Sequence, residues 1–484
     1  MNLIVPRLKR GPKMLGLTIA KNSETTLSRQ IYGQLRGLIL NGILKPGEKL
    51  ASTRDLAVNL GVSRNVILEA YDLLLAEGYV ITSPSSGTYV AQGAIFDRPE
   101  LKSHLESFKD TADPAGLSEG NVIDFRSGLP ALDLLPRKKF GQLYQEIIME
   151  IPEPFFGYDA PEGAYALRKA ICRYLIKNRG VQCSPEQTVI TSGAVQGMSL
   201  ISRLLLTPNR PYILEYPLHQ KIKELFEISG AKLHFVPADE NGLRTQDLPQ
   251  KINPALIAVT PSHQYPLGGL LPIQRRIELI KYARSTGSFI LEDDYDSEFR
   301  YQGPPVSSLQ GLDPEHVIYL GTFSKILFPA LRLGYLILPP ALLERCKELK
   351  LYDDNHSHTF EQLALARFIE TGGLERHISK IRKMYRKRRD TLITCLQANF
   401  PSISISGHST GLHLIAEFPG IIFDQTLTAQ LYHAGVQIHP VAVHTNDLGH
   451  FNKLIMGYSH LAPETIKEGV RILTTILHPV SSSH

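Results

Sequence analysis

The sequence Gly321-Thr-Phe-Ser-Lys325-Ile-Leu-Phe-Pro-Ala-Leu-Arg332-Leu-Gly-Tyr335 sets one lysine behind two small hydroxyl residues, with an arginine seven residues later. The apolar run before it, Val317-Ile-Tyr-Leu320, predicts a buried strand, so Lys325 is expected at or just past a strand end. A lysine held there, partly removed from water and near another cation, has a lowered amine pKa. It can then form a Schiff base with an aldehyde.

The neighbours of Lys325 indicate which aldehyde this would be. Thr322, Ser324 and Arg332 are the donors that a phosphate group needs. An aldehyde-binding lysine beside phosphate donors predicts pyridoxal phosphate (PLP) as the cofactor. The alternative is a solvated surface lysine beside a structural arginine, because most lysines keep their charged end in water.

The composition describes a folded protein with more than one domain. A chain of 484 residues with 43% hydrophobic and 20% charged residues predicts two or three globular domains. No apolar run approaches the roughly 18 residues that cross a bilayer, and no secretory signal is evident, so a cytoplasmic protein without a membrane partner is expected. The cysteines are scattered without metal-ligand spacing, which predicts reduced thiols and no metal site: Cys172, Cys183, Cys346 and Cys395.

The positive charge is concentrated at the N-terminus. Residues 1–92 contain 11 Lys+Arg and 6 Asp+Glu, whereas the rest of the chain contains 41 of each. A small basic segment on a neutral body predicts a module that binds a polyanion. The alternative is ordinary scatter of charge over a short segment.

Residues 23–92 have the pattern of a helix-turn-helix followed by a wing, after an N-terminal arm at 1–22. Ser52-Thr-Arg-Asp55 is a capping box, and Ser63 is expected to cap the helix that follows the turn at Gly61. The predicted elements are helices at 27–40, 52–60 and 64–77 and a hairpin of strands at 79–82 and 88–90.

Five residues of this module are predicted to contact DNA. Ser63, Arg64 and Asn65 begin the second helix of the pair, whose N-terminal residues read the major groove; Arg and Asn pair with guanine and adenine edges. Arg54 can hold a backbone phosphate. Gly87 lets the wing backbone approach the duplex closely.

The N-terminal module resembles the winged helix of the GntR superfamily from end to end. The resemblance is carried by Leu50-Ala-Ser-Thr-Arg-Asp-Leu-Ala57, Leu60-Gly-Val-Ser-Arg64, Ala70-Tyr-Asp-Leu-Leu74 and Gly87-Thr-Tyr-Val90. It implies binding to double-stranded operator DNA. Ala51 departs from the family, where proline is usual. The alternative is a helical bundle that uses the same turn for protein contacts.

After a polar linker at 93–121, residues 122–480 alternate strand-like and helical patterns, which predicts an α/β domain with a largely parallel sheet. The predicted strands are 188–191, 211–214, 256–260, 288–291, 317–320 and 335–338. Ligands bind at the carboxyl ends of such strands. The polar motifs of the chain do follow these strands.

Three of these motifs could form a site. Ser192-Gly193-Ala194 could cradle a phosphate at a helix N-terminus, or be a plain turn. Glu292-Asp-Asp-Tyr-Asp296 offers Asp293 to a pyridinium nitrogen and Tyr295 to a ring oxygen; a divalent-metal site and a solvated acidic loop are the alternatives. His263, in Pro261-Ser-His-Gln-Tyr265, could be structural or contact a cofactor.

Residues 122 to the C-terminus resemble the fold-type-I PLP-dependent aminotransferase domain in its MocR form: a large domain with a mostly parallel sheet and a small α/β C-terminal domain. The motifs are Asp124-Phe-Arg-Ser-Gly-Leu-Pro130, Arg179-Gly-Val181, Pro261-Ser-His-Gln-Tyr-Pro266, Glu292-Asp-Asp-Tyr-Asp-Ser-Glu-Phe299, Gly321-Thr-Phe-Ser-Lys325 and His377 near Tyr385. With the winged helix, the resemblance covers nearly the whole chain. It implies a homodimer, domain-swapped, that reads two DNA half-sites.

The resemblance also implies roles for individual residues. Lys325 would carry PLP as a Schiff base, Asp293 would pair with the ring nitrogen and Tyr295 with the ring oxygen. His219 and Tyr265 stand where the family has a ring-stacking aromatic and an asparagine. The phosphate would be held by Gly193, Ala194, Thr322, Ser324 and Arg332.

One departure bears on activity. Aminotransferases grip the substrate carboxylate with a C-terminal arginine, yet no arginine lies between Arg389 and Arg471. Near the strand expected at 454–456, only Lys453, His439, His444 and His450 are close enough in sequence to substitute.

We therefore predict a transcription regulator that senses PLP, or an amine or amino-acid effector, at Lys325, with little or no transaminase activity. The alternatives are an active aminotransferase with an accessory DNA-binding module, and a DNA-binding scaffold with an inactive pocket.

Overall fold

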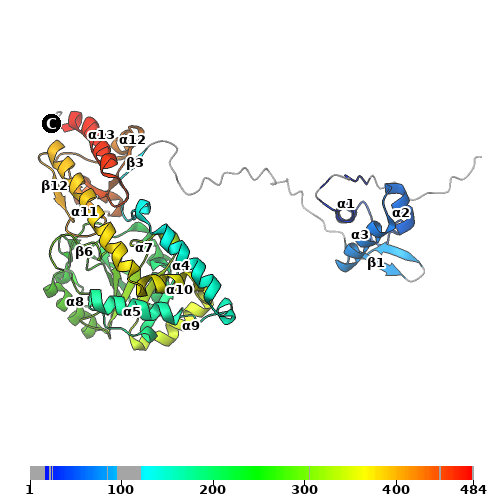
Figure 1. Cartoon of the computed structure of the whole chain (residues 1–484), viewed down its shortest axis with the longest axis horizontal. Helices are drawn as coiled ribbons and strands as arrows, with labels where there is room; N and C mark the ends of the chain where they lie inside the picture. Colours follow the sequence, from blue (N-terminus) through cyan, green and yellow to red (C-terminus); the bar gives the residue numbers. More distant parts are fainter. Residues whose placement is uncertain are drawn as a thin grey trace, which may run out of the picture. The chain divides into compact units, whose positions relative to one another are not determined.

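The computed structural model describes residues 17–20, 23, 25–83, 86–94, 122–304, 306–445 and 448–481. It divides into two compact units, Met1–Leu117 and Ser118–His484 (Figure 1). The predicted arm at 1–22 is described only at 17–20 and the predicted linker at 93–121 only at 93–94, so both lie almost wholly outside the described residues.

The first unit is a winged helix-turn-helix, as predicted. Its core is formed by apolar residues at helical spacing in α1, such as Ile31, Leu35 and Ile39, against Ile67 and Leu74 of α3. The wing pairs β1 with β2 antiparallel. The elements are α1 (Leu27–Leu40), α2 (Thr53–Leu60), α3 (Arg64–Ala76), β1 (Val80–Ser83) and β2 (Gly87–Val90).

The turn between α2 and α3 follows from its sequence. The Ser52 side chain accepts a hydrogen bond from the Asp55 backbone N–H, which begins α2. Gly61 ends α2 with φ 64°, a left-handed conformation that favours glycine. Ser63 occupies the position before α3, but its side chain makes no capping hydrogen bond. Ser63 therefore precedes α3 as predicted but does not cap it through its side chain.

The second unit is built on an eight-stranded sheet in the order β4-β11-β10-β9-β8-β5-β6-β7. Pairing is parallel from β10 through β9, β8 and β5 to β6, whereas β11 is antiparallel to both of its neighbours and β7 is antiparallel to β6. The strands are β4 (Thr188–Thr191), β5 (Tyr212–Tyr216), β6 (Leu233–Asp239), β7 (Gly242–Leu243), β8 (Leu256–Val259), β9 (Phe289–Asp294), β10 (Val317–Thr322) and β11 (Gly334–Ile337).

Every predicted strand of this unit is present, and the central ones are buried on both faces. Three of them extend beyond the predicted ends, and β5 does so by continuing to Tyr216. β9 continues through Asp293 to Asp294, and β10 continues to Thr322, so Lys325 lies three residues past the strand end. The helices of this part are α4 (Arg137–Glu150), α5 (Tyr165–Arg179), α6 (Ala194–Leu205), α7 (Gln220–Ile228), α8 (Ile273–Thr286), α9 (Leu343–Asp354) and α10 (Thr359–Glu370).

The 27-residue helix α11 (Gly373–Asn399) runs from the large sheet to a smaller C-terminal region of strands and helices (Figure 1). There β12-β13-β16-β15 form a four-stranded sheet, and β14 pairs with β3 near the start of the unit. The elements are β3 (Ile123–Asp124), β12 (Ser404–Ser406), β13 (His413–Glu417), α12 (Gln425–His433), β14 (Val436–Gln437), β15 (His439–Pro440), β16 (Lys453–Gly457) and α13 (Pro463–Ser481). Among the helices described, none is long and apolar enough to cross a bilayer.

Candidate functional site

A cavity of about 390 Å³ lies where the carboxyl ends of the large-sheet strands meet residues from the start and the end of the second unit. It gathers all the residues predicted to hold PLP except Gly193, which lies beside it. Those on its wall are Ala194, His219, Asp293, Tyr265, Tyr295, Thr322, Ser324, Lys325 and Arg332. Sequence motifs up to 138 residues apart (194–332) thus share one cavity, although their contacts with a cofactor stay a prediction.

Lys325 is held inside this cavity by a backbone carbonyl. Its Nζ donates a hydrogen bond to Gly128 O at 2.7 Å. Burial lowers the pKa of Lys325, while the carboxylates of Asp296 and Asp293 oppose the shift. The sequence predicted correctly that the pKa of Lys325 is lowered. The prediction that a nearby cation contributes was wrong, because Arg332 is not among the groups that shift this pKa.

One end of the cavity has the features of an anion-binding turn, called here the phosphate cradle after the group predicted to bind there. The turn at Gly193, with φ 87°, leads into the N-terminus of α6, whose free N–H groups favour an anion. Arg332 Nη2 donates to Ser192 O at 2.5 Å, and a Cβ at Gly193 would lie 3.1 Å from Arg332 Nη1. The guanidinium therefore lies directly against the turn, and the missing side chain of Gly193 makes room for it.

A second layer of contacts fixes this turn. Gln196 Oε1 accepts from the Ser192 backbone N–H at 2.7 Å, and Gln196 Nε2 donates to Asp354 Oδ2 at 2.9 Å. Lys350, fully buried, in turn donates to Asp354. The cradle is thus fixed before any anion arrives, which reduces the cost of binding.

At the other end, Asp293 differs from the acids around it. Glu292 accepts from the backbone N–H groups of Leu309 and Gln310, and Asp296 contacts His263. Asp294 accepts hydrogen bonds from Arg179, Tyr319 and Ser297. In the part of the chain that the structure describes, Asp293 alone of the four has no such partner.

This isolation changes the chemistry of Asp293. Burial, and then the charges of Asp294 and Asp296, raise its pKa to about 7, while Lys325 opposes the shift. A buried carboxyl without a donor is costly. A protonated ring nitrogen placed against Asp293 would provide both a donor and a compensating charge, so the residues present fit PLP. A solvated acidic loop does not fit, because Glu292, Asp294 and Asp296 are buried.

The raised pKa predicts a pH-dependent stability. A carboxyl whose folded pKa lies above its ordinary value of 3.8 imposes no cost below that value, and its cost grows as the pH rises to about 7. Asp293→Asn removes this cost. In ligand-free protein, the free energy of unfolding of Asp293→Asn relative to wild type should therefore rise by up to about 4 kcal/mol between pH 4 and pH 7.

Chemical denaturation across this pH range measures the effect. The matched control is Glu315→Gln, which neutralises an exposed carboxylate of the same unit. A difference between Asp293→Asn and wild type that stays constant from pH 4 to pH 7 would contradict the assigned environment of Asp293.

His263, for which the sequence left two interpretations, is a structural residue. It is buried outside the cavity wall, with Nδ1 2.8 Å from Asp296 Oδ2. Tyr295 donates its hydroxyl hydrogen to His263 O at 3.0 Å. Among the described residues, His263, Asp296 and His413 could approach one metal ion, but His413 Nε2 already contacts Pro266 O at 3.0 Å. The group positions Tyr295.

The opposite wall is a cluster of imidazole and phenol rings. The ring centroids of His219, Tyr265 and His444 lie 5.3–5.5 Å apart, and Tyr265 Oη is 3.3 Å from His444 Nε2. Burial, with smaller contributions from His219 and His439, lowers the pKa of His444 to about 4, so it is neutral at pH 7. This wall therefore offers uncharged hydrogen-bonding groups.

The structure also shows what surrounds the strand near which the family's arginine was expected. Ile455 of β16 is fully buried with Ile415 and Val441, and Tyr265 packs against this apolar cluster. Lys453 pairs with Glu417 and His439 with Asp124. Of the substitutes considered from sequence, His444 is the one whose ring contacts the cavity residues.

The predicted DNA-contacting residues are all exposed on the first unit: Arg54, Ser63, Arg64, Asn65 and Gly87. Arg64 Nε donates to Thr53 Oγ1 at 3.2 Å, which orients the side chain at the start of α3. Gly87 has φ 118°, and a Cβ there would lie 2.8 Å from Lys49 Cε. Lys49 is thus a cation beside the wing that the sequence interpretation missed.

Comparison with known proteins agrees with both halves of this description. Residues 27–90 match "Bacterial regulatory proteins, gntR family", and residues 121–448 match "Aminotransferase class I and II". The chain is 32% identical to the probable rhizopine catabolism regulatory protein MocR of Rhizobium meliloti, over 96% of this chain and 97% of that protein. It is 30% identical to the pyridoxine biosynthesis transcriptional regulator PdxR of Corynebacterium glutamicum, over 94% and 96%.

A solved structure shares the fold of the second unit. The α-aminoadipate aminotransferase LysN from Thermus thermophilus, complexed with N-(5'-phosphopyridoxyl)-L-leucine, matches with a TM-score of 0.68 and 26% identity, over 75% of this chain and 93% of LysN. The second unit therefore has the fold-type-I aminotransferase fold. The chain belongs to the MocR-type transcription regulators, in which a gntR-family DNA-binding domain precedes an aminotransferase class I and II domain.

Proposed function

We propose that this regulator binds PLP at Lys325 and that occupancy of the cavity changes how the winged helix binds operator DNA. The observation that carries the proposal is the unpartnered carboxyl of Asp293 in the same cavity as Lys325 and the phosphate cradle. The aminotransferase fold and the phosphopyridoxyl compound bound to LysN support it. When bound, PLP supplies an aldehyde that condenses with a primary amine and a ring that withdraws electrons.

Different residues of the cavity would contact different parts of PLP. Burial favours the neutral amine of Lys325, which is the nucleophilic form. Asp293 would accept from the ring nitrogen, and Tyr295, beside His263, would turn its hydroxyl hydrogen from His263 O to the ring oxygen. Gly193, Ala194, Thr322, Ser324 and Arg332 hold the phosphate, and His219 and Tyr265 cover the ring.

The effector that fits best is PLP itself or an amine without an α-carboxylate. His219 and Tyr265 on the cavity wall, and His444 packed against them, are uncharged at neutral pH, because burial lowers the pKa of both histidines. The cation on the cavity wall beside His219 is Lys221, whose single ammonium group cannot grip a carboxylate with two parallel hydrogen bonds as an arginine does. The name of the relative PdxR, a regulator of pyridoxine biosynthesis, supports PLP as the ligand sensed.

An active aminotransferase is the second candidate, because the fold and the Lys325 site resemble those of such enzymes. The uncharged wall is the observation against it. Catalytic turnover with an amino donor and a keto acid, lost in Lys325→Ala, would favour the enzyme over the regulator.

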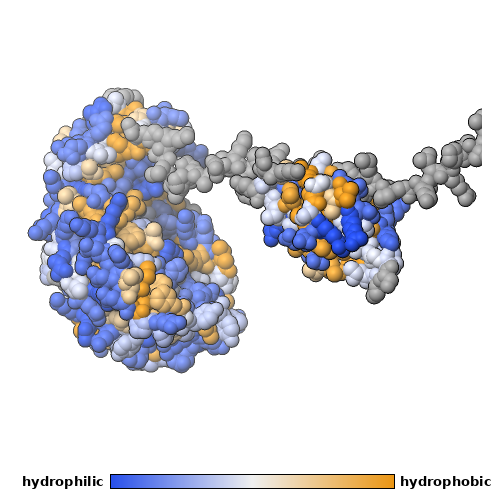
Figure 2. Space-filling model, turned by 45° about the vertical axis from the view of Figure 1, so that its right-hand side comes forward, coloured by the Kyte–Doolittle hydropathy of each residue, from blue (hydrophilic) through white to orange (hydrophobic). Residues whose placement is uncertain are grey.

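We also propose a homodimer, domain-swapped, located in the cytoplasm with its operator. Large apolar side chains are exposed on the second unit, including Tyr158 at 89%, Met149 at 79% and Tyr352 at 80%, and Figure 2 shows apolar patches among hydrophilic residues on this surface. Such patches are typical of protein interfaces. The proposed domains are 23–92 and 122–480, joined by 93–121, and sedimentation would test the dimer.

The regulatory proposal predicts that DNA binding depends on PLP. Cofactor-free protein is incubated with sheared genomic DNA, with and without PLP, and the bound fragments are sequenced. We expect PLP to change the affinity for the enriched fragments, because a ligand that prefers one of two conformations shifts their balance. Equal binding with and without saturating PLP would contradict the proposal.

A further inference from the structure

The helix α11 carries a charge that the rest of its unit does not. Outside residues 1–92 the chain has equal numbers of acidic and basic residues, 41 of each. Within the 27 residues of α11, eight are Lys or Arg and two are Asp or Glu. A local excess of this size in a neutral body points to a specific use rather than to general basicity.

Two of the eight cations are buried, and three of the exposed ones, Arg376, Arg382 and Arg386, each donate a hydrogen bond to a backbone carbonyl. Arg388 is buried and donates to Asp133 Oδ2 at 2.7 Å. Arg389 is also buried, pairs with Asp390 at 2.6 Å and lies over the ring of Tyr301. These two arginines hold α11 in the fold and are not available to a partner.

The other cations of α11 are exposed. Within the described residues, none of them lies within ion-pair distance of a carboxylate, and the acid between them, Asp390, is already paired with Arg389. Lys467 of α13 is a further exposed cation without an ion pair in this part of the structure. We use the name α11 cationic face for Arg376, Lys380, Lys383, Arg386, Lys387 and Lys467.

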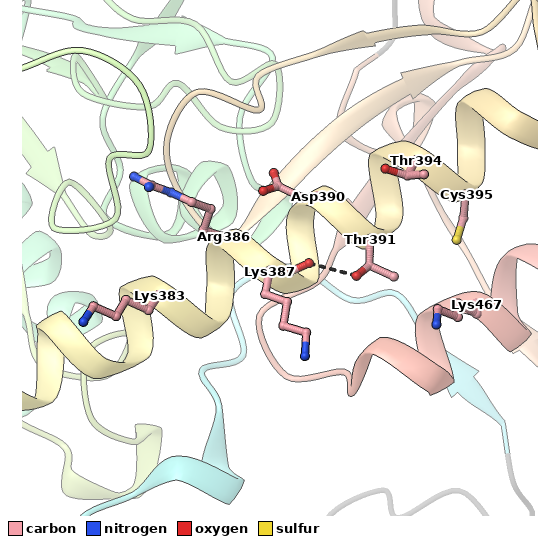
Figure 3. Close-up of a pocket in the computed structure, with 8 residues that line it drawn as sticks. All are labelled: Lys383, Arg386, Lys387, Asp390, Thr391, Thr394, Cys395 and Lys467. Carbon is pink, nitrogen blue, oxygen red and sulfur yellow. Dashed lines mark hydrogen bonds between the residues drawn. The ribbon is translucent and has the colours of Figure 1, made fainter.

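The α11 cationic face is elongated along the helix axis. Arg376, Lys380, Lys383 and Lys387 are spaced by four, three and four residues, which places them on one side of a helix. At 1.5 Å per residue the row is roughly 16 Å long. In Figure 3, Lys383 and Lys387 extend from α11 and Lys467 from the neighbouring α13, and the three line a surface depression of about 530 Å³.

A row of unpaired cations fits an extended polyanion better than a small one. A single phosphate would satisfy one or two of these side chains and leave the rest repelling one another. DNA carries one charge per 3.4 Å along each strand, so a row of roughly 16 Å spans about five phosphates. We propose that the α11 cationic face binds the phosphate backbone of DNA without reading its sequence.

The proposal predicts a change in the salt dependence of DNA binding. Each phosphate contact contributes about 0.9 to the slope of log K against log salt concentration. Relative to wild type, the variant K383Q/R386Q/K387Q/K467Q should lower that slope by about 3 on a duplex of arbitrary sequence, about 80 base pairs long. Fluorescence anisotropy of the full-length protein over a series of salt concentrations measures this slope, and no PLP is needed.

Two variants make the result specific to this face. K177Q/K232Q/K251Q/K281Q removes the same charge from exposed positions elsewhere in the second unit and should leave most of the slope intact. K383R/K387R/K467R keeps the charges and should keep the wild-type slope. A wild-type slope in the quadruple variant of the face, or an equal loss in the matched variant, would overturn the proposal whatever the outcome for PLP.

Discussion

Lys325→Ala protein is expected to lack the visible absorbance band that wild-type protein acquires with PLP. Of the two lysines that line the cavity among the described residues, Lys325 is the one we expect to bond the aldehyde, because its Nζ is fixed by Gly128 O at 2.7 Å and its burial favours the neutral form. Borohydride reduction of wild type should leave a phosphopyridoxyl mass on the peptide that contains Lys325. The same treatment of Lys325→Ala should leave no adduct.

A lysine on the same wall provides the control. Lys221 also lines the cavity, so Lys221→Ala removes an amine from the same environment. This variant should keep both the band and the adduct. An adduct that persists on another lysine in Lys325→Ala, or one that is absent from wild type, would contradict the assignment of Lys325.

The sequence predicted the elements of the fold better than their directions. Runs such as Val317–Leu320 are apolar because both faces of the strand are buried, and periodicity detects this. The antiparallel placement of β11 between β10 and β4 could not be predicted, because burial depends on side-chain pattern and strand direction leaves no trace in it. The end of β9 was also misplaced, since charged residues such as Asp293 are rarely strand residues.

The candidate site divides in the same way. Lys325, Asp293 and Arg332 belong to short motifs at strand ends, where sequence and chemistry coincide. The contacts that were not predicted are long-range: Gly128, which was missed, meets Lys325 across 197 positions, and His444, named only as one of four possible substitutes for the arginine, meets Tyr265 across 179. A backbone carbonyl or a single histidine has no recognisable pattern in the nearby sequence. The contacts of Gly128 with Lys325 and of His444 with Tyr265 are therefore seen only in the folded structure.

Arg64→Ala is expected to reduce strongly the preference of the protein for its operator over other DNA. Arg64 begins α3, is exposed, and is oriented by the hydrogen bond from its Nε to Thr53 Oγ1 at 3.2 Å. An arginine in this position can pair with both acceptors of a guanine edge, which is worth about 1–3 kcal/mol of discrimination. Affinity for fragments enriched by the wild type should therefore fall roughly 10- to 100-fold, measured by anisotropy at fixed salt.

Loss of charge alone must be separated from loss of base reading. Arg29→Ala removes an exposed arginine from α1 of the same unit and should retain the operator preference. Binding of Arg64→Ala to DNA of arbitrary sequence should weaken far less than its binding to the operator, because phosphate contacts elsewhere remain. If Arg64→Ala weakens both kinds of DNA equally, Arg64 contacts only the backbone, and sequence is read by other residues of α3 or by the wing.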